Sequence, residues 1–159
     1  MFGGGGNDTL SGDLLFAGQD NDLVVGGRDR MWGGPGDDFL LGDNIAGGPG
    51  DDVVVAGPDY LDGGSGNDRF QGDGVHGDAS NGTGTGFDNG TYGADVILGR
   101  AGNDRIRADY NQYKDVELES GGDDFVDGGG GVDFCEGGPG TDTARRCEDS
   151  LEIEHPLWR

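Results

Sequence analysis

The chain has 159 residues, of which 38 are glycine, and 32 acidic residues against 10 basic ones give it a net charge of −22. Such a charge excludes nucleic acid and anionic membrane surfaces as partners, because both would repel it. No run approaches the ~18 apolar residues that a membrane span requires. Low hydrophobicity with high charge is normally typical of disorder, and only the regular spacing of the Asp residues indicates a fold.

The chain restarts itself every thirty residues, at Gly3, Gly33 and Gly63. A fixed period predicts one structural unit stacked many times. Each block divides into pieces of nine, five, nine and seven residues, and every piece carries an Asp followed two positions later by an apolar residue. We expect these apolar side chains to point inward: Leu10, Leu15, Val24, Met31, Leu40, Ile45, Val54, Leu61, Phe70 and Val75.

The nine-residue pieces that begin at Gly3, Gly33, Gly47 and Gly63 fit GGxGxDxUx, and the piece at Ala17 fits it with Ala17 and Asp20 in place of glycines. This pattern resembles the calcium-binding repeat of the RTX, or repeats-in-toxin, family. The resemblance covers nearly the whole chain, with a break around residues 77 to 89. It implies an all-β fold, a parallel β-roll or β-helix solenoid, that binds several Ca²⁺ ions.

The repeat has a physical reason to bind calcium. Its glycines permit φ > 0, so that the first six residues can bend tightly and aim carbonyl oxygens at one point. Stacked strands lie ~4.8 Å apart, so each Asp lies over the next, and two carboxylates at that distance repel by roughly 3 kcal/mol at a dielectric constant of 20. Calcium fits between them because it takes six to eight hard oxygen ligands.

The resemblance also implies the ligands, which are the Asp of each turn and carbonyl oxygens of the glycine region. The Asp ligands expected are Asp8, Asp22, Asp38, Asp52, Asp68, Asp95, Asp104, Asp133 and Asp142, with Asp124 in a seven-residue piece. The glycines expected around them are Gly4, Gly6, Gly33, Gly34, Gly36, Gly47, Gly48, Gly50, Gly63, Gly64 and Gly66.

The pieces of five and seven residues depart from the regular repeat. Full nine-residue turns alternate with these short pieces, so we expect coils of 14 or 16 residues, in which the five full turns of the first half share one edge of the roll with four calcium sites between them. The short pieces keep an Asp but have lost glycines. Two readings stay open for these residues, a hydrogen bond to the turn's own backbone or a second, weaker metal row: Asp13, Asp29, Asp43, Asp59 and Asp73.

We expect regular repeats over residues 1–76, an inserted loop at 77–89, less regular repeats over 90–145 and a C-terminal cap at 146–159. His76 is interpreted as an exposed loop residue rather than a ligand or base. Within the interruption from Ala108 to Ser120, the alternation of Val116 and Leu118 predicts a strand. Cys135 and Cys147 suggest a disulfide that pins the last coil to the cap, and two buried thiols are the alternative.

Outward positions of three successive coils carry six apolar residues, Leu23, Val25, Phe39, Leu41, Val53 and Val55. A contiguous apolar face often marks an interface. We therefore expect this face to pair with a second copy or a neighbouring domain, or to be covered by the chain's own tail.

No catalytic motif is present in the sequence, and we expect no enzyme activity. Ice binding is disfavoured, because the outward ladder is aliphatic. The favoured function is a secreted, extracellular calcium-binding module that is largely unfolded without calcium. The alternatives are an adhesion or oligomerisation module that uses the outward apolar face, and an accessory domain of a secreted hydrolase. Met1 leads directly into the first repeat, which suggests a domain of a larger protein or export without a cleaved N-terminal signal.

Overall fold

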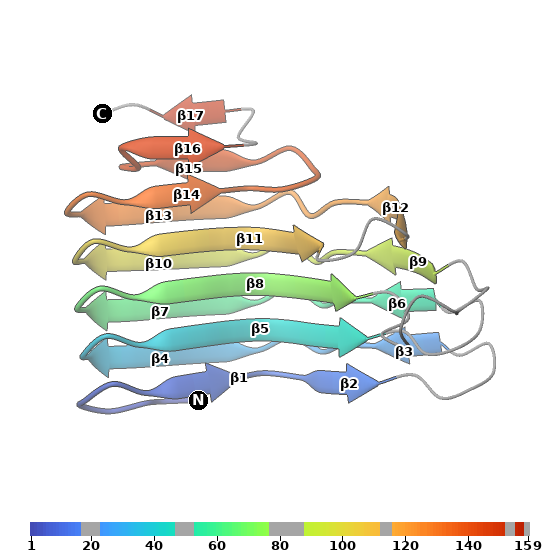
Figure 1. Cartoon of the computed structure of the whole chain (residues 1–159), viewed down its shortest axis with the longest axis horizontal. Helices are drawn as coiled ribbons and strands as arrows, with labels where there is room; N and C mark the ends of the chain where they lie inside the picture. Colours follow the sequence, from blue (N-terminus) through green and yellow to red (C-terminus); the bar gives the residue numbers. More distant parts are fainter. Residues whose placement is uncertain (17–22, 47–52, 77–87, 112–115, 152–154, 158–159) are drawn as a thin grey trace.

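The computed structural model describes residues 1–16, 23–46, 53–76, 88–111, 116–151 and 155–157. In these residues the chain is a stack of parallel strands without a helix, and it rises from the N-terminal coil at one end to the C-terminal strands at the other (Figure 1). None of the described segments forms a helix that could cross a bilayer. The architecture is a parallel β-roll, as the repeat predicted.

Three sheets make up the walls of the roll. The front sheet contains β1 (Thr9–Ser11), β2 (Leu14–Phe16), β5 (Phe39–Ala46), β8 (Arg69–His76), β11 (Arg105–Asn111), β14 (Phe134–Glu136) and β16 (Asp149–Leu151). The rear sheet contains β4 (Arg30–Pro35), β7 (Tyr60–Ser65), β10 (Val96–Ala101), β13 (Phe125–Gly130), β15 (Thr143–Arg145) and β17 (His155–Leu157). The side sheet contains β3 (Leu23–Val25), β6 (Val53–Val55), β9 (Asp88–Thr91) and β12 (Val116–Ser120).

The coils of the lower roll are much longer than the predicted 14 or 16 residues, so this part of the prediction is wrong. Phe39 of β5 pairs with Arg69 of β8, and Arg69 pairs with Arg105 of β11, which gives coils of 30 and 36 residues. The reason is that the five-residue pieces do not turn the chain. Gly42 and Asp43, for example, lie inside the long strand β5.

The five full turns of the first half therefore do not share one edge. The strands that follow Asp8, Asp38 and Asp68 belong to the front sheet, whereas β3 and β6, which follow Asp22 and Asp52, pair in the side sheet. Asp22 and Asp52 themselves lie outside the described residues.

Inward apolar residues form two stacks. The larger one joins the front and rear sheets and contains Leu10, Leu40, Phe70 and Ile106 opposite Met31, Leu61, Ile97 and Val126. The smaller one contains Ile45, Ala56 and Tyr92, with Leu15 and Val24 packed against it. These stacks confirm the inward positions read from the sequence for the residues whose side chains are described.

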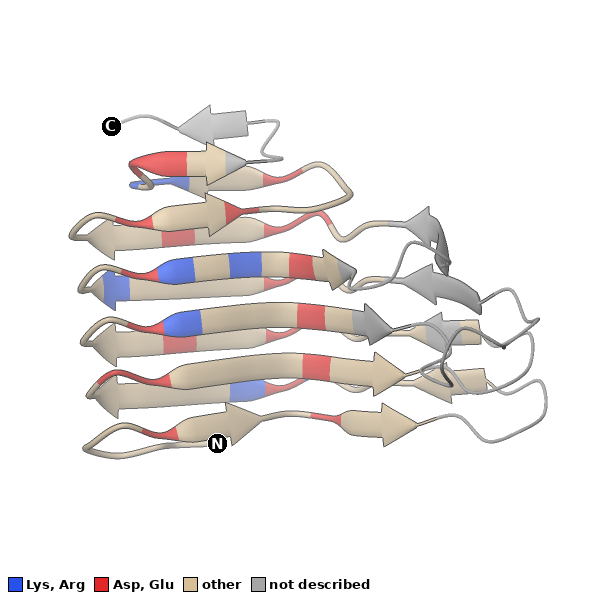
Figure 2. Ribbon diagram, viewed as in Figure 1, with Lys and Arg blue, Asp and Glu red and all other residues tan. Residues whose placement is uncertain are grey.

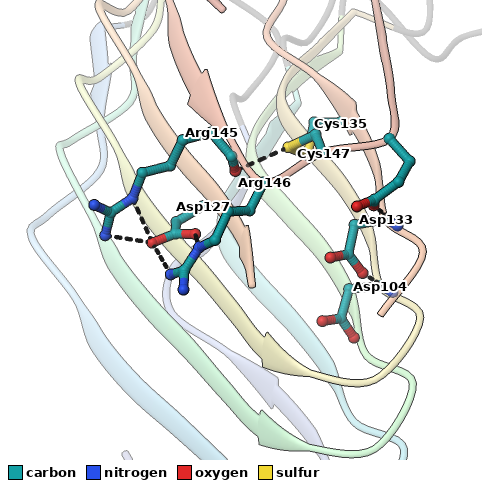
Figure 3. Close-up of a disulfide and its surroundings, with 8 residues drawn as sticks. Asp104, Asp127, Asp133, Cys135, Arg145, Arg146 and Cys147 are labelled. Carbon is teal, nitrogen blue, oxygen red and sulfur yellow. Dashed lines mark hydrogen bonds and ion pairs between the residues drawn. A yellow bond between two sulfur atoms is a disulfide. The ribbon is translucent and has the colours of Figure 1, made fainter. Parts of the chain in front are cut away.

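The roll narrows toward its C-terminal end. Strand β13 pairs with β15 at a spacing of 18 residues and β14 pairs with β16 at 15, and β12 is the last strand of the side sheet. A disulfide joins Cys135 of β14 to Cys147, with the two Cα atoms 6.0 Å apart (Figure 3). It links the innermost position of one coil to the coil above, as the cysteine spacing suggested.

Two other expectations bear on the irregular segments. The strand expected at Val116 and Leu118 is present as β12. The predicted loop at residues 77–89 falls mostly outside the described residues, and β9 begins at Asp88.

The predicted apolar face is split between two sheets. Phe39 and Leu41 lie on β5 of the front sheet and are half-buried, whereas Leu23, Val25, Val53 and Val55 lie on the paired strands β3 and β6. Leu23 is 70% exposed, Val25 56% and Val53 42%. The six residues therefore do not form one surface, because the intervening chain carries them to different walls of the roll.

Candidate metal centres

A first row of carboxylates runs up the edge where the rear sheet turns into the front sheet. We call it the edge row, and its members are Asp8, Asp38, Asp68, Asp104 and Asp133. In each step the backbone N–H of one Asp donates to Oδ1 of the Asp in the next coil, at 2.7 to 2.8 Å. At the end of the row the N–H of Asp133 donates to Glu148.

The second oxygen of each edge carboxylate has no hydrogen-bond partner among the described residues. Oδ2 is buried and unpaired in all five members of the edge row. It lies so close to the first glycine of the turn that a side chain on that glycine would collide with it, and we call the place that this side chain would occupy the hollow. A β-carbon on Gly33 would lie 2.3 Å from Asp38 Oδ2 and 2.7 Å from the Gly63 carbonyl oxygen. A carboxylate and a carbonyl of the next coil therefore converge there, which is the oxygen chemistry that calcium prefers.

The turns of this edge have the backbone that the glycine pattern predicted. Positions two and four of the turns adopt positive φ, at Gly4 and Gly6, Gly34 and Gly36, and Gly64 and Gly66. Gly33 and Gly63 line the hollows beside Asp38 and Asp68. Gly47, Gly48 and Gly50 lie outside the described residues.

Two further rows face each other inside the roll. The front row, on the front sheet, is Asp13, Asp43, Asp73 and Asp109, and the rear row, just before the strands of the rear sheet, is Asp29, Asp59, Asp95, Asp124 and Asp142. Figure 2 shows acidic residues recurring at the same place along β5, β8 and β11. The rear row is linked as the edge row is, with each N–H donating to the next Asp Oδ1 at 2.8 to 3.0 Å.

The front row bonds differently. Oδ2 of Asp13, Asp43 and Asp73 accepts the N–H of Gly27, Gly57 and Gly93 from the opposite wall, at 2.7 Å in each case. Asp109 accepts the N–H of Gly122 at 3.0 Å in the same way. The other oxygen, Oδ1, is buried and unpaired in Asp43, Asp73 and Asp109.

Front and rear carboxylates meet in three groups of three. These triads are Asp13, Asp29 and Asp43, then Asp43, Asp59 and Asp73, then Asp73, Asp95 and Asp109, and in each triad one oxygen from every residue lies within 4.8 Å of the others. We call these seven residues the interior column. The hydrogen-bond reading of the short pieces is wrong in its donor, because the front-row carboxylates accept N–H groups of the opposite wall and not of their own turn. The metal reading stays a prediction.

Burial disfavours the charged form of these carboxylates. Desolvation raises the pKa of Asp43 to about 6 and that of Asp59 to about 7, and the repulsion of neighbouring Asp residues adds to this effect. Hydrogen bonds from backbone N–H groups lower both pKa values but do not cancel the rise. The pKa values of Asp73, Asp95 and Asp109 are also raised by desolvation. In the edge row, desolvation raises the pKa of Asp68 and that of Asp104 to about 6. Ionised carboxylates in these places need a cation.

The predicted Asp ligands thus divide between two places. Asp8, Asp38, Asp68, Asp104 and Asp133 stand in the edge row, whereas Asp95, Asp124 and Asp142 stand in the rear row. Sequence reasoning missed Asp109, because its piece lacks the glycine of GDLLF, GDNIA and GDGVH. A spacing signal existed, since Asp109 follows Asp104 by five residues, as Asp43 follows Asp38 and Asp73 follows Asp68.

Stacked glycine-rich turns that enclose unpaired carboxylates define a parallel β-roll of the calcium-binding class. A family model described as the RTX calcium-binding nonapeptide repeat matches residues 2–30, 12–40, 26–44, 41–69, 55–77, 89–109 and 120–144. These segments cover more than half of the chain, which therefore belongs to the RTX repeat family. No curated protein and no solved structure matches it.

Proposed function

We propose that this calcium-binding β-roll folds when calcium binds to it, and that it does so outside the cell. The observation that carries the proposal is the edge row, in which five buried carboxylate oxygens have no hydrogen-bond partner in the part of the chain that the structure describes. Placing an unpaired charge in such a site costs several kcal/mol, so ionised Asp residues there oppose folding. A cation in the hollows reverses this cost, and its binding free energy becomes folding free energy.

The ligands of the edge sites would be carboxylates and carbonyls of successive coils. Asp38 Oδ2 and the Gly63 carbonyl oxygen converge on one hollow, and Asp104 Oδ2 and the Gly128 carbonyl oxygen converge on another. Calcium supplies the compensating charge when bound there. Extracellular calcium modules bind at 10⁻⁴ to 10⁻³ M, so the roll would stay open in a calcium-poor cytoplasm and close after export.

The test is far-UV circular dichroism of the chain during a calcium titration, with magnesium as the control and a chelator for reversal. We expect calcium alone to convert coil into β-structure. An equally folded chain in chelator would contradict the proposal. Asp38→Asn and Asp68→Asn should raise the calcium concentration at the midpoint, whereas Asp149→Asn, an exposed carboxylate on β16, should leave it unchanged.

We propose a structural role rather than a catalytic one, and the RTX repeat is itself a calcium-binding structural module. A role in association remains a second candidate, supported by the exposed Leu23, Val25 and Val53 on neighbouring strands. This patch contains three of the six residues of the apolar face predicted from the sequence. Sedimentation of the calcium-loaded chain tests it: self-association that Leu23→Ser and Val53→Ser remove supports the role, and a monomer at all concentrations rejects pairing with a second copy.

A further inference from the structure

We propose that the interior column is a second set of metal sites, in which divalent cations of calcium type lie inside the roll, each held by one of the three carboxylate triads. These sites differ from the edge turns in most of their ligands. Asp13, Asp29, Asp43, Asp59 and Asp73 come from the five- and seven-residue pieces, which lack the GGxGxD turn, and only Asp95 comes from a nine-residue piece, GTYGADVIL. The sites also lie between two walls of the roll rather than between successive turns of one edge.

Burial is the first reason to expect an ion. Asp43 and Asp73 are 0% exposed, and Asp59, Asp95 and Asp109 are at most 4% exposed. An unpaired oxygen remains on each of these five residues: Asp43 Oδ1, Asp59 Oδ2, Asp73 Oδ1, Asp95 Oδ2 and Asp109 Oδ1. In ordinary proteins nearly all such buried polar atoms have a partner. Five orphaned oxygens in one column indicate a shared ligand.

Tyr92 is a second and independent observation. Its side chain is 4% exposed, and its hydroxyl is buried without a hydrogen-bond partner. Burial, followed by the charges of Asp109 and Asp73, raises the pKa of this phenol. Tyr92 packs in the smaller apolar stack with Ile45 and Ala56, and its neutral oxygen lies on the side of the column that carries Asp73 and Asp109. Nearly all buried polar atoms have a partner, so this unpaired hydroxyl also indicates a missing ligand.

Backbone oxygen completes the ligand set. A β-carbon on Gly42 would lie 2.1 Å from Asp59 Oδ2 and 2.3 Å from the Gly72 carbonyl oxygen. A β-carbon on Gly72 would lie 2.0 Å from Asp95 Oδ2 and 2.6 Å from the Ala108 carbonyl oxygen. The glycines before Asp43 and Asp73 thus allow a carboxylate and a carbonyl to converge beside the triads, whereas Asp109 is preceded by Ala108.

No arginine of the described residues forms an ion pair with the column, and the cation of the chain that acts on Asp29, at the lower end of the column, is the N-terminal ammonium group. Among the described residues, the arginine ion pairs reach Asp62, Asp127 and Glu136. The column has seven carboxylates in three triads, so three divalent ions would supply +6 against −7, whereas three monovalent ions would supply only +3. Zinc is disfavoured because all the ligand atoms are oxygens. Magnesium is disfavoured because it gives up its water molecules reluctantly, and the column is buried.

Neighbouring triads share residues, so native mass spectrometry of the calcium-loaded chain tests the proposal by the number of bound ions. Asp73 belongs to two triads and Asp109 to one. We expect Asp73→Asn to hold two calcium ions fewer than the wild type and Asp109→Asn to hold one fewer. Asn keeps an oxygen that can accept the N–H of Gly93 or Gly122, so the fold has its hydrogen bond while the charge is lost. Asp149→Asn is the matched control and should hold the wild-type number.

Folded variants with the wild-type ion count would overturn the proposal and would mean that carboxylates of the column are protonated instead of bound to metal. Such a result would leave the proposed function standing, because the edge row does not use these residues. Should the Asn variants not fold, Tyr92→Phe removes only a hydroxyl. With Tb³⁺ as the probe, we expect Tyr92→Phe to lose part of the tyrosine-sensitised emission, and equal emission from both proteins would also overturn the proposal.

Discussion

Two buried carboxylates show opposite ways of carrying charge in this roll. Asp127 on the rear sheet is 3% exposed, and Asp73 in the interior column is 0% exposed. Asp127 accepts hydrogen bonds from Arg145 and Arg146, at 2.5 to 2.7 Å (Figure 3), and these cations hold its pKa below the usual value despite burial. Asp73 has no arginine partner among the described residues, and burial raises its pKa.

The difference follows from the side of the strand on which each residue stands. Asp127 follows the inward Val126, so alternation turns it to the outside of the rear sheet, where arginine side chains can reach it. Asp62 is placed in the same way after Leu61 and pairs with Arg100 at 2.6 Å. Asp62 and Asp127 are therefore neutralised by arginines of the chain, whereas no arginine of the described residues pairs with a carboxylate of the interior column.

Calcium removal should produce the largest effect, because it acts on the inner carboxylates and leaves the arginine pairs intact. Each site saturated at a thousand times its Kd adds ~4 kcal/mol to the free energy of unfolding. Several sites together exceed the stability of a typical domain. Thermal unfolding at increasing free calcium should show a steeply rising Tm. A Tm independent of calcium would show that the arginine pairs and the apolar stacks suffice.

The pH dependence of the calcium-free chain should separate the two kinds of carboxylate. Asp43 and Asp59 have folded pKa values of about 6 and about 7, above the 3.8 of an ordinary Asp. Their stabilising contribution is thus fully present below pH ~4 and is lost as the pH rises through 6 and 7. Asp127, with a lowered pKa, behaves oppositely and loses its contribution only in acid.

We therefore expect dialysed, calcium-free protein to gain β-structure by circular dichroism as the pH falls from 8 toward 5. Each pKa unit corresponds to about 1.4 kcal/mol per group. Calcium binding should show the reverse trend and weaken on acidification, because protons compete for the same oxygens. A calcium-free chain that loses structure steadily from pH 8 to pH 5 would contradict this assignment of the interior column.

Substitution of Asp127 should cost stability without changing the calcium content. Asp127→Asn leaves two guanidinium groups without their charged acceptor, and we expect a loss of about 1 to 3 kcal/mol. The lower end applies, since both arginine side chains are 47% exposed and solvent can take over part of the interaction. Urea unfolding in saturating calcium measures the loss. A reduced ion count in native mass spectrometry would show that Asp127 acts as a ligand instead.

The smallest effect is expected at Arg100, which occupies a turn position where Gly4, Gly34 and Gly64 have positive φ. Arg100 itself has φ of 80°, a conformation that costs a side-chain-bearing residue ~1 to 2 kcal/mol. Its pair with Asp62 is half-exposed and worth less than about 1 kcal/mol. Arg100→Gly should therefore be as stable as the wild type or slightly more so. Arg100→Ala loses the pair but keeps the strain, and should unfold at lower urea.

The sequence by itself determined the all-β class, the parallel roll, the inward positions such as Leu40 and Leu61, and the edge turns with their glycines. These features are local, because each depends on a spacing of two to nine residues that only one backbone conformation satisfies. The RTX family and its calcium chemistry could be read from the same spacing. Asp109 could have been found from its distance to Asp104, although its piece lacks the glycine.

Only the tertiary structure decided how many residues make one coil. A five-residue piece that begins with Gly-Asp can turn the chain or continue a strand. Pairing with the coils above and below selects the strand. That choice placed Asp43 and Asp73 in the middle of a wall and set them against Asp59 and Asp95. It also separated Leu23 and Val53 from Phe39. The interior column exists because distant pieces meet across the roll, and contact between walls is not encoded in any local spacing.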